Sequence, residues 1–397
     1  MSSISTFSKF LPQEECLAVS NQQVSLKIGL PKEHTFQERR ICLAPDDVAV
    51  LVANGHQILI ETGAGEEANF SDRDYSEAGA QIVYDSEQVF SCPIVLKVEP
   101  PTKAEIEHLK PKSVLLSALQ IKTQDKDYFT SLAKKQITAL AFEYIQDDEY
   151  NHPVVQSISE IIGVASVLVA SELIGNTSYG GGGILFGNIT GVPPIEVVFL
   201  GANEVTQAAV KSAIGLGAKV KVFDNSLANL RKLKQAVNEN VFTSTLQPKV
   251  LKKALMRCNV VIGAMRGENR SPVVVNEDMV KIMKRGAVIV DVSIDTGGCV
   301  ETSRITTFAE PTFMEHNVIH YCVPNIASRY ARTASFSLSN ILTPYLLKIG
   351  EEGGIENVLH IDKGLRNGLY FYHGVLTDNT ISQWFGIPYK PINLLFI

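Results

Sequence analysis

The segment VVFLGANEVTQAAVKSAIGLGAKVKVFDN, Val197–Asn225, decides the fold of the chain. An apolar strand, a tight turn, a helix with apolar residues at helical spacing and a second strand follow in the order of a dinucleotide-binding unit. Asp224 ends the second strand, where such units place an acidic residue that accepts ribose hydroxyls. The turn reads GANEVT over residues 201–206 instead of G-x-G-x-x-G. The segment therefore predicts a Rossmann core with an altered phosphate-binding turn.

The altered turn argues against tight diphosphate binding. Gly201 is kept, but Asn203 stands where a second glycine lets the backbone approach phosphate, and Thr206 replaces the third glycine. Glu204 adds a carboxylate at the helix N-terminus, which otherwise attracts anions. At about 4–6 Å, like charges repel by on the order of 2–4 kcal/mol, so we expect about 30-fold weaker binding or more. The alternative is a self-capped helix in a Rossmann core with a structural role only.

The composition is that of a globular protein with two domains. The 397 residues exceed one ordinary core, and 45% are hydrophobic and 20% charged. A net charge of −6 argues against a nucleic-acid partner. No apolar run reaches about 18 residues, so we expect no membrane span. The six cysteines are scattered and the first 25 residues are polar, which favours a cytoplasmic protein without a metal site or a secretory signal.

Strands alternate with helical segments through both halves of the chain. Two long helical segments interrupt this series: SISEIIGVASVLVASELI (157–174), with a serine as its cap, and a second segment that begins at Asn325. We predict an α/β protein of two doubly wound Rossmann-like domains, joined by the long helices and separated by a ligand-binding cleft. The predicted strands are LKIGLP (26–31), QILIET (57–62), PIVLKVEPP (93–101), SVLLSAL (113–119), EVVFLG (196–201), KVKVFD (219–224), NVVIGAM (259–265) and AVIVDVSID (287–295).

Several longer motifs resemble one family along nearly the whole chain. They are IGLPKE, ERRICLAP, GHQILIETGAGE and DYSEAGAQIV in the first half, and GGGGILFGNITGVPPIEVVFLG, VDVSIDTGGCVETSRITTFAEPTF and YCVPNIASRYARTASFSLSNILTPY in the second. Together they resemble the alanine dehydrogenase and proton-translocating transhydrogenase family from about Leu26 to Pro388. The length, and the continuation through residue 397, favour an alanine dehydrogenase over a transhydrogenase subunit.

The resemblance implies a domain plan and a reaction. After an N-terminal extension (1–25), residues 26–152 and 332–397 would form a substrate-type domain, and 153–331 an NAD(P)-binding Rossmann domain. Family members oxidise L-alanine to pyruvate and ammonium with NAD, and they form homo-oligomers. The expected partners are therefore NAD, a small amino acid or 2-oxo acid, and further copies of the chain.

The resemblance also locates the catalytic positions, two of which are replaced. The family arginine falls on Arg40, which is present, and an aspartate near the nicotinamide falls on Asp295. The family lysine and histidine positions carry Glu99 and Gln120. Lys97, two residues before Glu99 on the same strand face, is a weak substitute whose alternative is a paired or solvated amine.

The cofactor positions implied by the resemblance are Ser159, Gly201, Asn203, Thr206, Asp224 and Asn325. Ser159 reads equally well as a helix cap, and retention of Asn325 fits a turn or cap. The charged residues Arg266, Glu268 and Arg270 follow the strand NVVIGAM. We interpret them as a solvated loop.

Two functions follow from these replacements. The first is a diverged family member with impaired or lost catalysis, a pseudoenzyme that acts as a binding, regulatory or structural protein. The second is an active NAD-dependent dehydrogenase for alanine or another amino acid, with a rearranged site. In that case Glu99 beside Arg40 would hold a substrate with an extra amino group.

Overall fold

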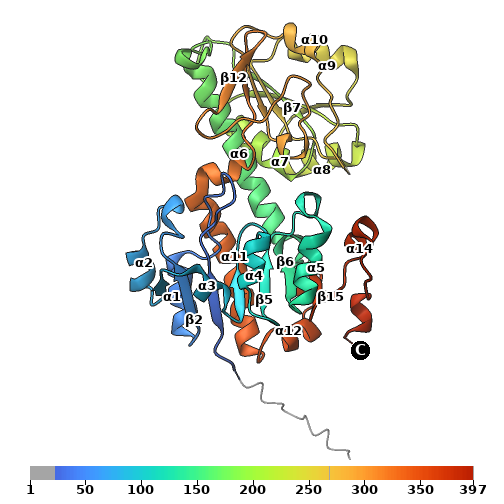
Figure 1. Ribbon diagram of the computed structural model, residues 1–397. Coiled ribbons are helices and arrows are strands. Elements are labelled where there is room, and N and C mark those ends of the chain that lie inside the picture. Colours follow the sequence, from blue (N-terminus) through green and yellow to red (C-terminus); the bar gives the residue numbers. More distant parts are fainter. Residues whose placement is uncertain (1–22, 268, 397) are drawn as a thin grey trace, which may run out of the picture.

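The computed structural model describes residues 23–267 and 269–396, which are built on two sheets. Nearly all of the predicted extension 1–25, Cys16 and Glu268 lie outside the described residues. Figure 1 shows the sheets in two bodies, one above the other, with α6 (Pro153–Gly175) running between them. The prediction of two Rossmann-like domains is confirmed.

The first body contains an eight-stranded sheet in the order β15-β14-β6-β5-β4-β1-β2-β3. Its members are β1 (Lys27–Leu30), β2 (Gln57–Glu61), β3 (Gln81–Val83), β4 (Ile94–Leu96), β5 (Val114–Ser117), β6 (Thr138–Ala141), β14 (Leu369–Tyr372) and β15 (Val375–Leu376). β1 to β6 pair in parallel, whereas β14 and β15 are antiparallel. The β14–β6 pairing returns the C-terminal segment, red in Figure 1, to the first body. The exact domain boundaries stay a prediction.

The second body contains a seven-stranded sheet in the order β12-β13-β11-β10-β7-β8-β9. Its members are β7 (Glu196–Leu200), β8 (Lys219–Phe223), β9 (Phe242–Ser244), β10 (Val260–Gly263), β11 (Val288–Asp291), β12 (Thr312–Glu315) and β13 (Val318–Tyr321). Six strands are parallel, and only β12 is antiparallel. From β9 the parallel strands follow the order of a dinucleotide-binding fold, with the switch point between β7 and β10.

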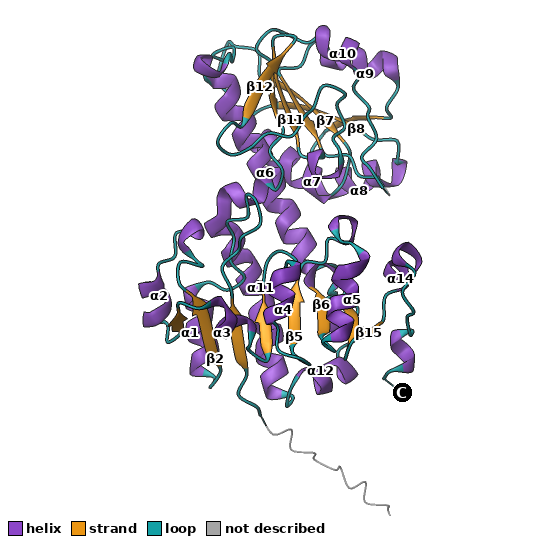
Figure 2. Ribbon diagram, viewed as in Figure 1, coloured by secondary structure: helices purple, strands orange, loops and turns teal. Residues whose placement is uncertain are grey.

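The central strands are apolar because helices cover both faces of each sheet, as Figure 2 shows. All four residues of β10 and of β11 are buried. The α-helices are α1 (Pro45–Ala53), α2 (Asp72–Glu77), α3 (Ser86–Phe90), α4 (Lys103–His108), α5 (Lys126–Lys134), α6, α7 (Glu204–Gly215), α8 (Leu227–Val237), α9 (Pro248–Leu255), α10 (Glu277–Lys281), α11 (Ala331–Glu351), α12 (Ile355–Ile361), α13 (Lys363–Arg366) and α14 (Asn379–Phe385).

The long helix α6 begins four residues earlier than predicted. Pro153 occupies its first position, where the fixed φ of proline suits a helix start, and His152 is an N-cap without a side-chain hydrogen bond. The predicted serine cap is therefore wrong. Among the described residues, α6 is the one helix long and apolar enough to cross a membrane, and half of its most apolar stretch is buried. A core helix passes the same test, so the absence of a span stays a prediction.

Candidate active site

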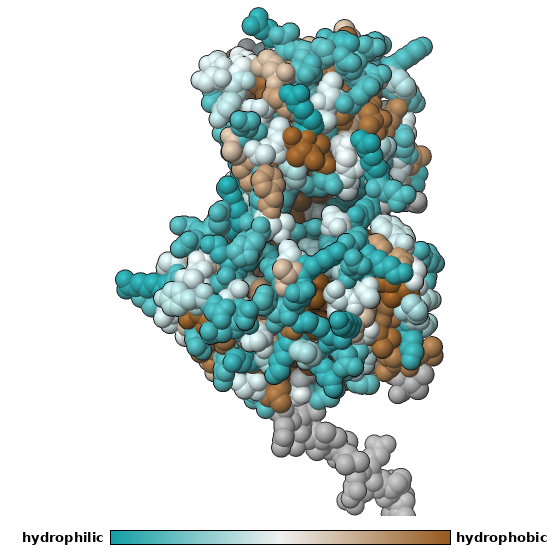
Figure 3. Space-filling model, in the orientation of Figure 1, coloured by the Kyte–Doolittle hydropathy of each residue, from teal (hydrophilic) through white to brown (hydrophobic). Residues whose placement is uncertain are grey.

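The candidate catalytic residues follow parallel strands whose carboxyl ends meet between the two bodies. Arg40 follows β1, Glu99 follows β4, Gln120 follows β5, and Glu143 follows β6. All four line one cavity of about 220 Å³. Apolar residues of α6 complete the wall, among them Ile158 and the neighbouring valines. Figure 3 shows the molecule narrowing at this junction, with polar residues over most of the visible face.

Arg40 is held by a carboxylate of its own chain. Its Nε and Nη2 atoms donate to Glu38 Oε1 at 2.8 Å and Oε2 at 2.5 Å, a two-pronged pair. Both residues are buried, at 8% and 6% exposure. Burial alone would raise the pKa of Glu38, but Arg40 outweighs it and holds the pKa well below its ordinary value. Sequence reasoning missed Glu38, although it lies only two residues before Arg40.

Glu99 and Gln120 are brought together beside this pair. Gln120 Nε2 donates to Glu99 Oε2 at 2.5 Å, and Glu99 Oε1 lies 3.7 Å from Arg40 Nη2. Burial, reinforced by the negative charge of Glu38, raises the pKa of Glu99 to about 7. The cavity therefore contains a carboxyl group that changes its charge near neutral pH.

Glu143 was not identified from the sequence. Its Oε1 atom accepts from the backbone N–H of Leu119 at 2.7 Å. Its Oε2 atom is buried without a hydrogen-bond partner in the described part of the chain, and burial raises the pKa of the carboxyl. The signal was available, because Glu143 stands two residues after a buried strand, at the same sheet edge as Glu99.

Lys97 does not line this cavity. It is 1% exposed, and its Nζ atom donates to Glu33 Oε2 at 2.5 Å and lies 3.7 Å from Glu105 Oε1. Lys97 is therefore a buried amine paired with carboxylates, which is one of the alternatives predicted for it from the sequence. The geometry gives no support to Lys97 as a substitute for the family lysine.

Asp295 and Asn325 join the Arg40 cluster from the second body. The N–H of Asn325 donates to Asp295 Oδ1 at 3.0 Å, and its Nδ2 donates to Glu38 Oε2 at 2.8 Å. Burial raises the pKa of Asp295 to about 6. Asn325 has φ of +54° and makes no side-chain cap, so its side chain links the two bodies instead.

The turn between β7 and α7 is closed by its own side chains. Gly201 has φ of +97°, and a Cβ there would lie 2.5 Å from the carbonyl oxygen of Ala264, so only glycine fits. Asn203 caps α7, since its Oδ1 accepts from the N–H of Thr206 at 3.2 Å. Its Nδ2 donates to the Ala264 carbonyl at 2.7 Å. Asn203, which replaces the second glycine of the turn, is thus the N-cap of α7.

The charges beside the turn are also paired. Glu204 does not cap α7; its Oε2 lies 3.4 Å from Arg266 Nη1. Arg266 Nη2 also donates to Ser159 Oγ at 3.3 Å. The Arg266 side chain is 55% exposed, as expected for a loop residue, but it contacts Glu204 of α7 and Ser159 of α6. Ser159 lies inside α6, so the alternative that it caps this helix is wrong.

Asp224 is turned toward the protein backbone. Its Oδ2 accepts from the N–H of Ala202 at 2.8 Å and its Oδ1 from that of Ser226 at 2.7 Å. A cavity of about 540 Å³ remains beside Asp224 and the turn. A dinucleotide would fit these residues incompletely, because the amides of Ala202 and Thr206 are already used and Glu204 is negative.

Metal ligands are not grouped in the described residues. Within 23–267 and 269–396, no set of three or more His, Cys, Asp or Glu side chains is placed to hold a metal ion. Arg270, in the loop after β10, donates to the Gly297 carbonyl at 3.0 Å.

Comparisons with known proteins cover both bodies. Residues 29–162 match the domain described as "Alanine dehydrogenase/PNT, N-terminal domain", and residues 166–379 match "Alanine dehydrogenase/PNT, C-terminal domain". "Alanine dehydrogenase 2" of Staphylococcus aureus is 34% identical over 369 residues, 92% of this chain and 98% of that protein. A solved "L-alanine dehydrogenase" has a TM-score of 0.82 and 34% identity, over 90% of this chain and 98% of its own.

A transhydrogenase from Sinorhizobium meliloti has a TM-score of 0.75 at 20% identity, over 89% of this chain and 99% of its own, and shares the fold. The motifs that carry the resemblance lie inside the matched segments, apart from Ile28 at the start of IGLPKE. The chain therefore belongs to the alanine dehydrogenase/PNT family.

Proposed function

We propose that this chain is a diverged family member that oxidises L-alanine poorly or not at all and acts as a binding or regulatory protein. One observation carries the proposal: Glu99 and Gln120 meet in a cavity whose lining contains no lysine and no histidine among the described residues. Its setting, a cytoplasmic homo-oligomer that takes a small amino acid or 2-oxo acid, is part of the same proposal.

The missing groups matter for the chemistry. Oxidation of an amino acid needs a cation for the substrate carboxylate and a group that takes a proton from the amine. Arg40 is already neutralised by Glu38, and Arg266, the other cation of the lining, is paired with Glu204. Gln120 has no proton to exchange near neutral pH. Loss of a positioned acid–base group costs about 10²–10⁴-fold in rate, and lost orientation adds to this. We therefore expect L-alanine turnover at least about 10³-fold below that of an active relative.

Weak binding of NAD is the second part of the proposal. The side chain of Asn203 accepts a hydrogen bond from the N–H of Thr206, and that of Asp224 accepts one from the N–H of Ala202. Fewer backbone N–H donors of the turn are therefore left for a diphosphate. The Arg266 ion pair offsets the charge of Glu204 and makes its repulsion smaller than the sequence alone suggests. We expect NAD to bind at least about tenfold more weakly than to a glycine-rich turn.

A single assay tests both parts. NADH absorbance is followed with L-alanine at alkaline pH, and with pyruvate plus ammonium in reverse, while NADH fluorescence measures binding. The double variant Glu99→Lys/Gln120→His should recover activity only when Glu204→Gly and Thr206→Gly are added. The turn variant without the catalytic changes is the matched control. Robust turnover of L-alanine by the natural chain would refute the proposal.

A second function is favoured by two carboxyl groups of the cavity, whose lining also contains Arg40 and Arg266. Glu99 has a pKa of about 7, which suits a general base, and Glu143 offers an unpartnered carboxylate oxygen to a cation. These two groups support an oxidoreductase for an amino acid that carries a second amino group. The same assay with diamino acids in place of L-alanine separates the two functions. Turnover abolished by Glu143→Gln would support this one.

A further inference from the structure

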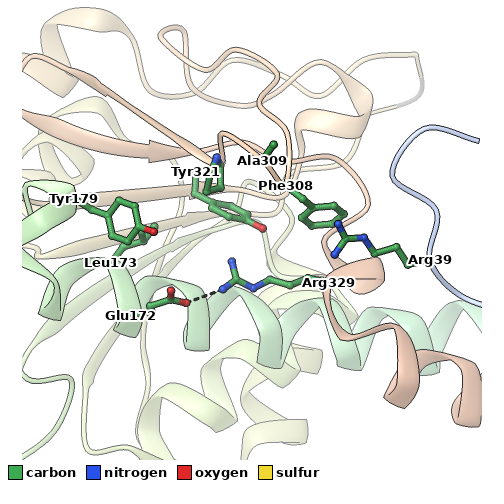
Figure 4. A pocket seen from close by; sticks show the side chains of 9 residues that line it. Arg39, Glu172, Leu173, Tyr179, Phe308, Ala309, Tyr321 and Arg329 are labelled. Carbon is green, nitrogen blue, oxygen red and sulfur yellow. Dashed lines mark hydrogen bonds and ion pairs between the residues drawn. The ribbon is translucent and has the colours of Figure 1, made fainter. Parts of the chain in front are cut away.

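A second cavity, of about 280 Å³, lies between the two bodies and shares no lining residue with the active-site cavity. Arg39 comes from the segment between β1 and α1, and Glu172 comes from α6. Phe308 lies in the loop before β12, Tyr321 ends β13, and Arg329 lies in the short helix η6 (Ile326–Tyr330). Figure 4 shows these side chains around one space.

Two guanidinium groups face this space. The Arg39 Cζ atom lies 4.6 Å from the centre of the Phe308 ring, and its Nε lies 3.2 Å from Glu67. Arg329 Nη2 donates to Glu172 Oε2 at 2.7 Å. Each guanidinium has five donors, so one carboxylate contact leaves others free for a ligand. In Figure 4 the Arg39 guanidinium lies beside the Phe308 ring, and the Arg329 guanidinium is directed toward Glu172.

Tyr321 contributes a buried hydroxyl. The residue is 1% exposed, and its oxygen makes no hydrogen bond of ordinary geometry in the described part of the chain, but the Arg329 guanidinium lies close enough to oppose the rise that burial causes in the pKa of Tyr321. Because a guanidinium can only donate, the proton of this hydroxyl stays available for an acceptor oxygen in the cavity. In Figure 4 the hydroxyl points into the cavity, between the Phe308 ring and the Arg329 guanidinium.

We propose that this cavity binds a small oxyanion, a carboxylate or a phosphate, between Arg39 and Arg329, with the Tyr321 hydroxyl as a further donor. Glu172 is the one carboxylate in the lining and Glu67 contacts Arg39 from outside it, so each guanidinium has one carboxylate partner and keeps other donors for a ligand. The guanidinium fork matches the oxygens of carboxylate and phosphate. Because Arg39 belongs to one body and Tyr321 to the other, the bound anion holds the two bodies together next to Arg40 of the candidate active site.

The test measures the melting temperature of the full chain against phosphate and, separately, acetate, with ionic strength held constant by sodium chloride. A tenfold excess over the dissociation constant should raise the melting temperature by about 1–2 °C. Arg329→Gln and Tyr321→Phe should weaken the response, and Glu172→Gln should tighten binding about threefold or more, because it removes a repelling carboxylate. Arg73→Gln, which breaks an exposed Arg–Glu pair elsewhere, is the matched control and should keep the natural response.

Arg329→Gln and Glu172→Gln should change the response to the anion in opposite directions if the cavity is a ligand site. If the two residues form only a structural ion pair, both variants should change the melting temperature in the same direction. A response to only one of the two anions identifies which oxyanion the site takes. No response of the natural chain to either anion would overturn the proposal. So would an equal response in the Arg329→Gln and Tyr321→Phe variants, since the anion would then bind at the active site or the turn.

Discussion

At the scale of the residue, the contribution of Glu99 to the stability of the folded chain depends on pH. Its pKa is raised from 4.5 to about 7, by burial first and by Glu38 second. Between these values the folded chain binds more protons than the unfolded chain, so this contribution to stability falls as the pH rises from about 4.5 to about 7. We expect Glu99→Gln to gain on the order of 1–3 kcal/mol at pH 8, and less than half of that at pH 5. Urea unfolding at both pH values measures the difference, and an equal gain at both would contradict it.

The candidate site was predictable where a residue has a local signal. Arg40, Glu99 and Gln120 lie in segments that resemble the family motifs, Glu99 and Gln120 close behind apolar strands, and the structure brings all three to one cavity. The role of Glu38 was not predicted, because it depends on the backbone conformation that lets one carboxylate accept hydrogen bonds from two nitrogen atoms of Arg40. The pairing of Arg266 with Glu204 was also missed, since the two are 62 residues apart and meet only in the folded sheet.

At the scale of the element, the contact between α6 and α7 depends on one glycine. A Cβ added to Gly163 would lie 2.4 Å from the Val205 carbonyl oxygen and 2.7 Å from Ala208 Cβ. We expect Gly163→Ala to lower the free energy of unfolding by about 1–3 kcal/mol, because overpacking outweighs the better helix propensity of alanine. Gly175→Ala, at the end of the same helix, is the control, because its nearest neighbour would be 3.7 Å away. A comparable loss in both variants, measured by denaturant unfolding, would argue against this packing.

The elements that sequence reasoning located are those with a continuous apolar pattern. All eight strands predicted from such runs are present, divided between the two sheets. The missed strands β14 and β6 pair across more than two hundred residues, with Leu369 opposite Leu140, and no local pattern specifies this partner. The sequence predicts the start of α6 four residues too late, because Ser157 resembles a helix cap, whereas Pro153 occupies the first turn of the helix.

At the scale of the whole molecule, exposed apolar side chains gather on α6 and on the glycine-rich loop that follows it. Val164 and Leu168 on the helix are 40% and 44% exposed, and Leu185 and Ile189 in the loop are 69% and 50% exposed. The N–H of Ile184 donates to the carbonyl of Ile174 at 3.3 Å, so the loop is tied to the end of the helix. Such surfaces mark sites of protein association.

We therefore expect the chain to form at least a dimer with closed symmetry, with this surface in the interface. The double variant Leu168→Glu/Leu185→Glu should dissociate the assembly, because it would bury carboxylates without partners. Leu227→Glu, at a 56% exposed site on α8, should leave the assembly intact. Light scattering across micromolar concentrations distinguishes the species. A mass of 43.4 kDa for the natural chain throughout would exclude the assembly, and an undisturbed oligomer in the double variant would place its interface elsewhere.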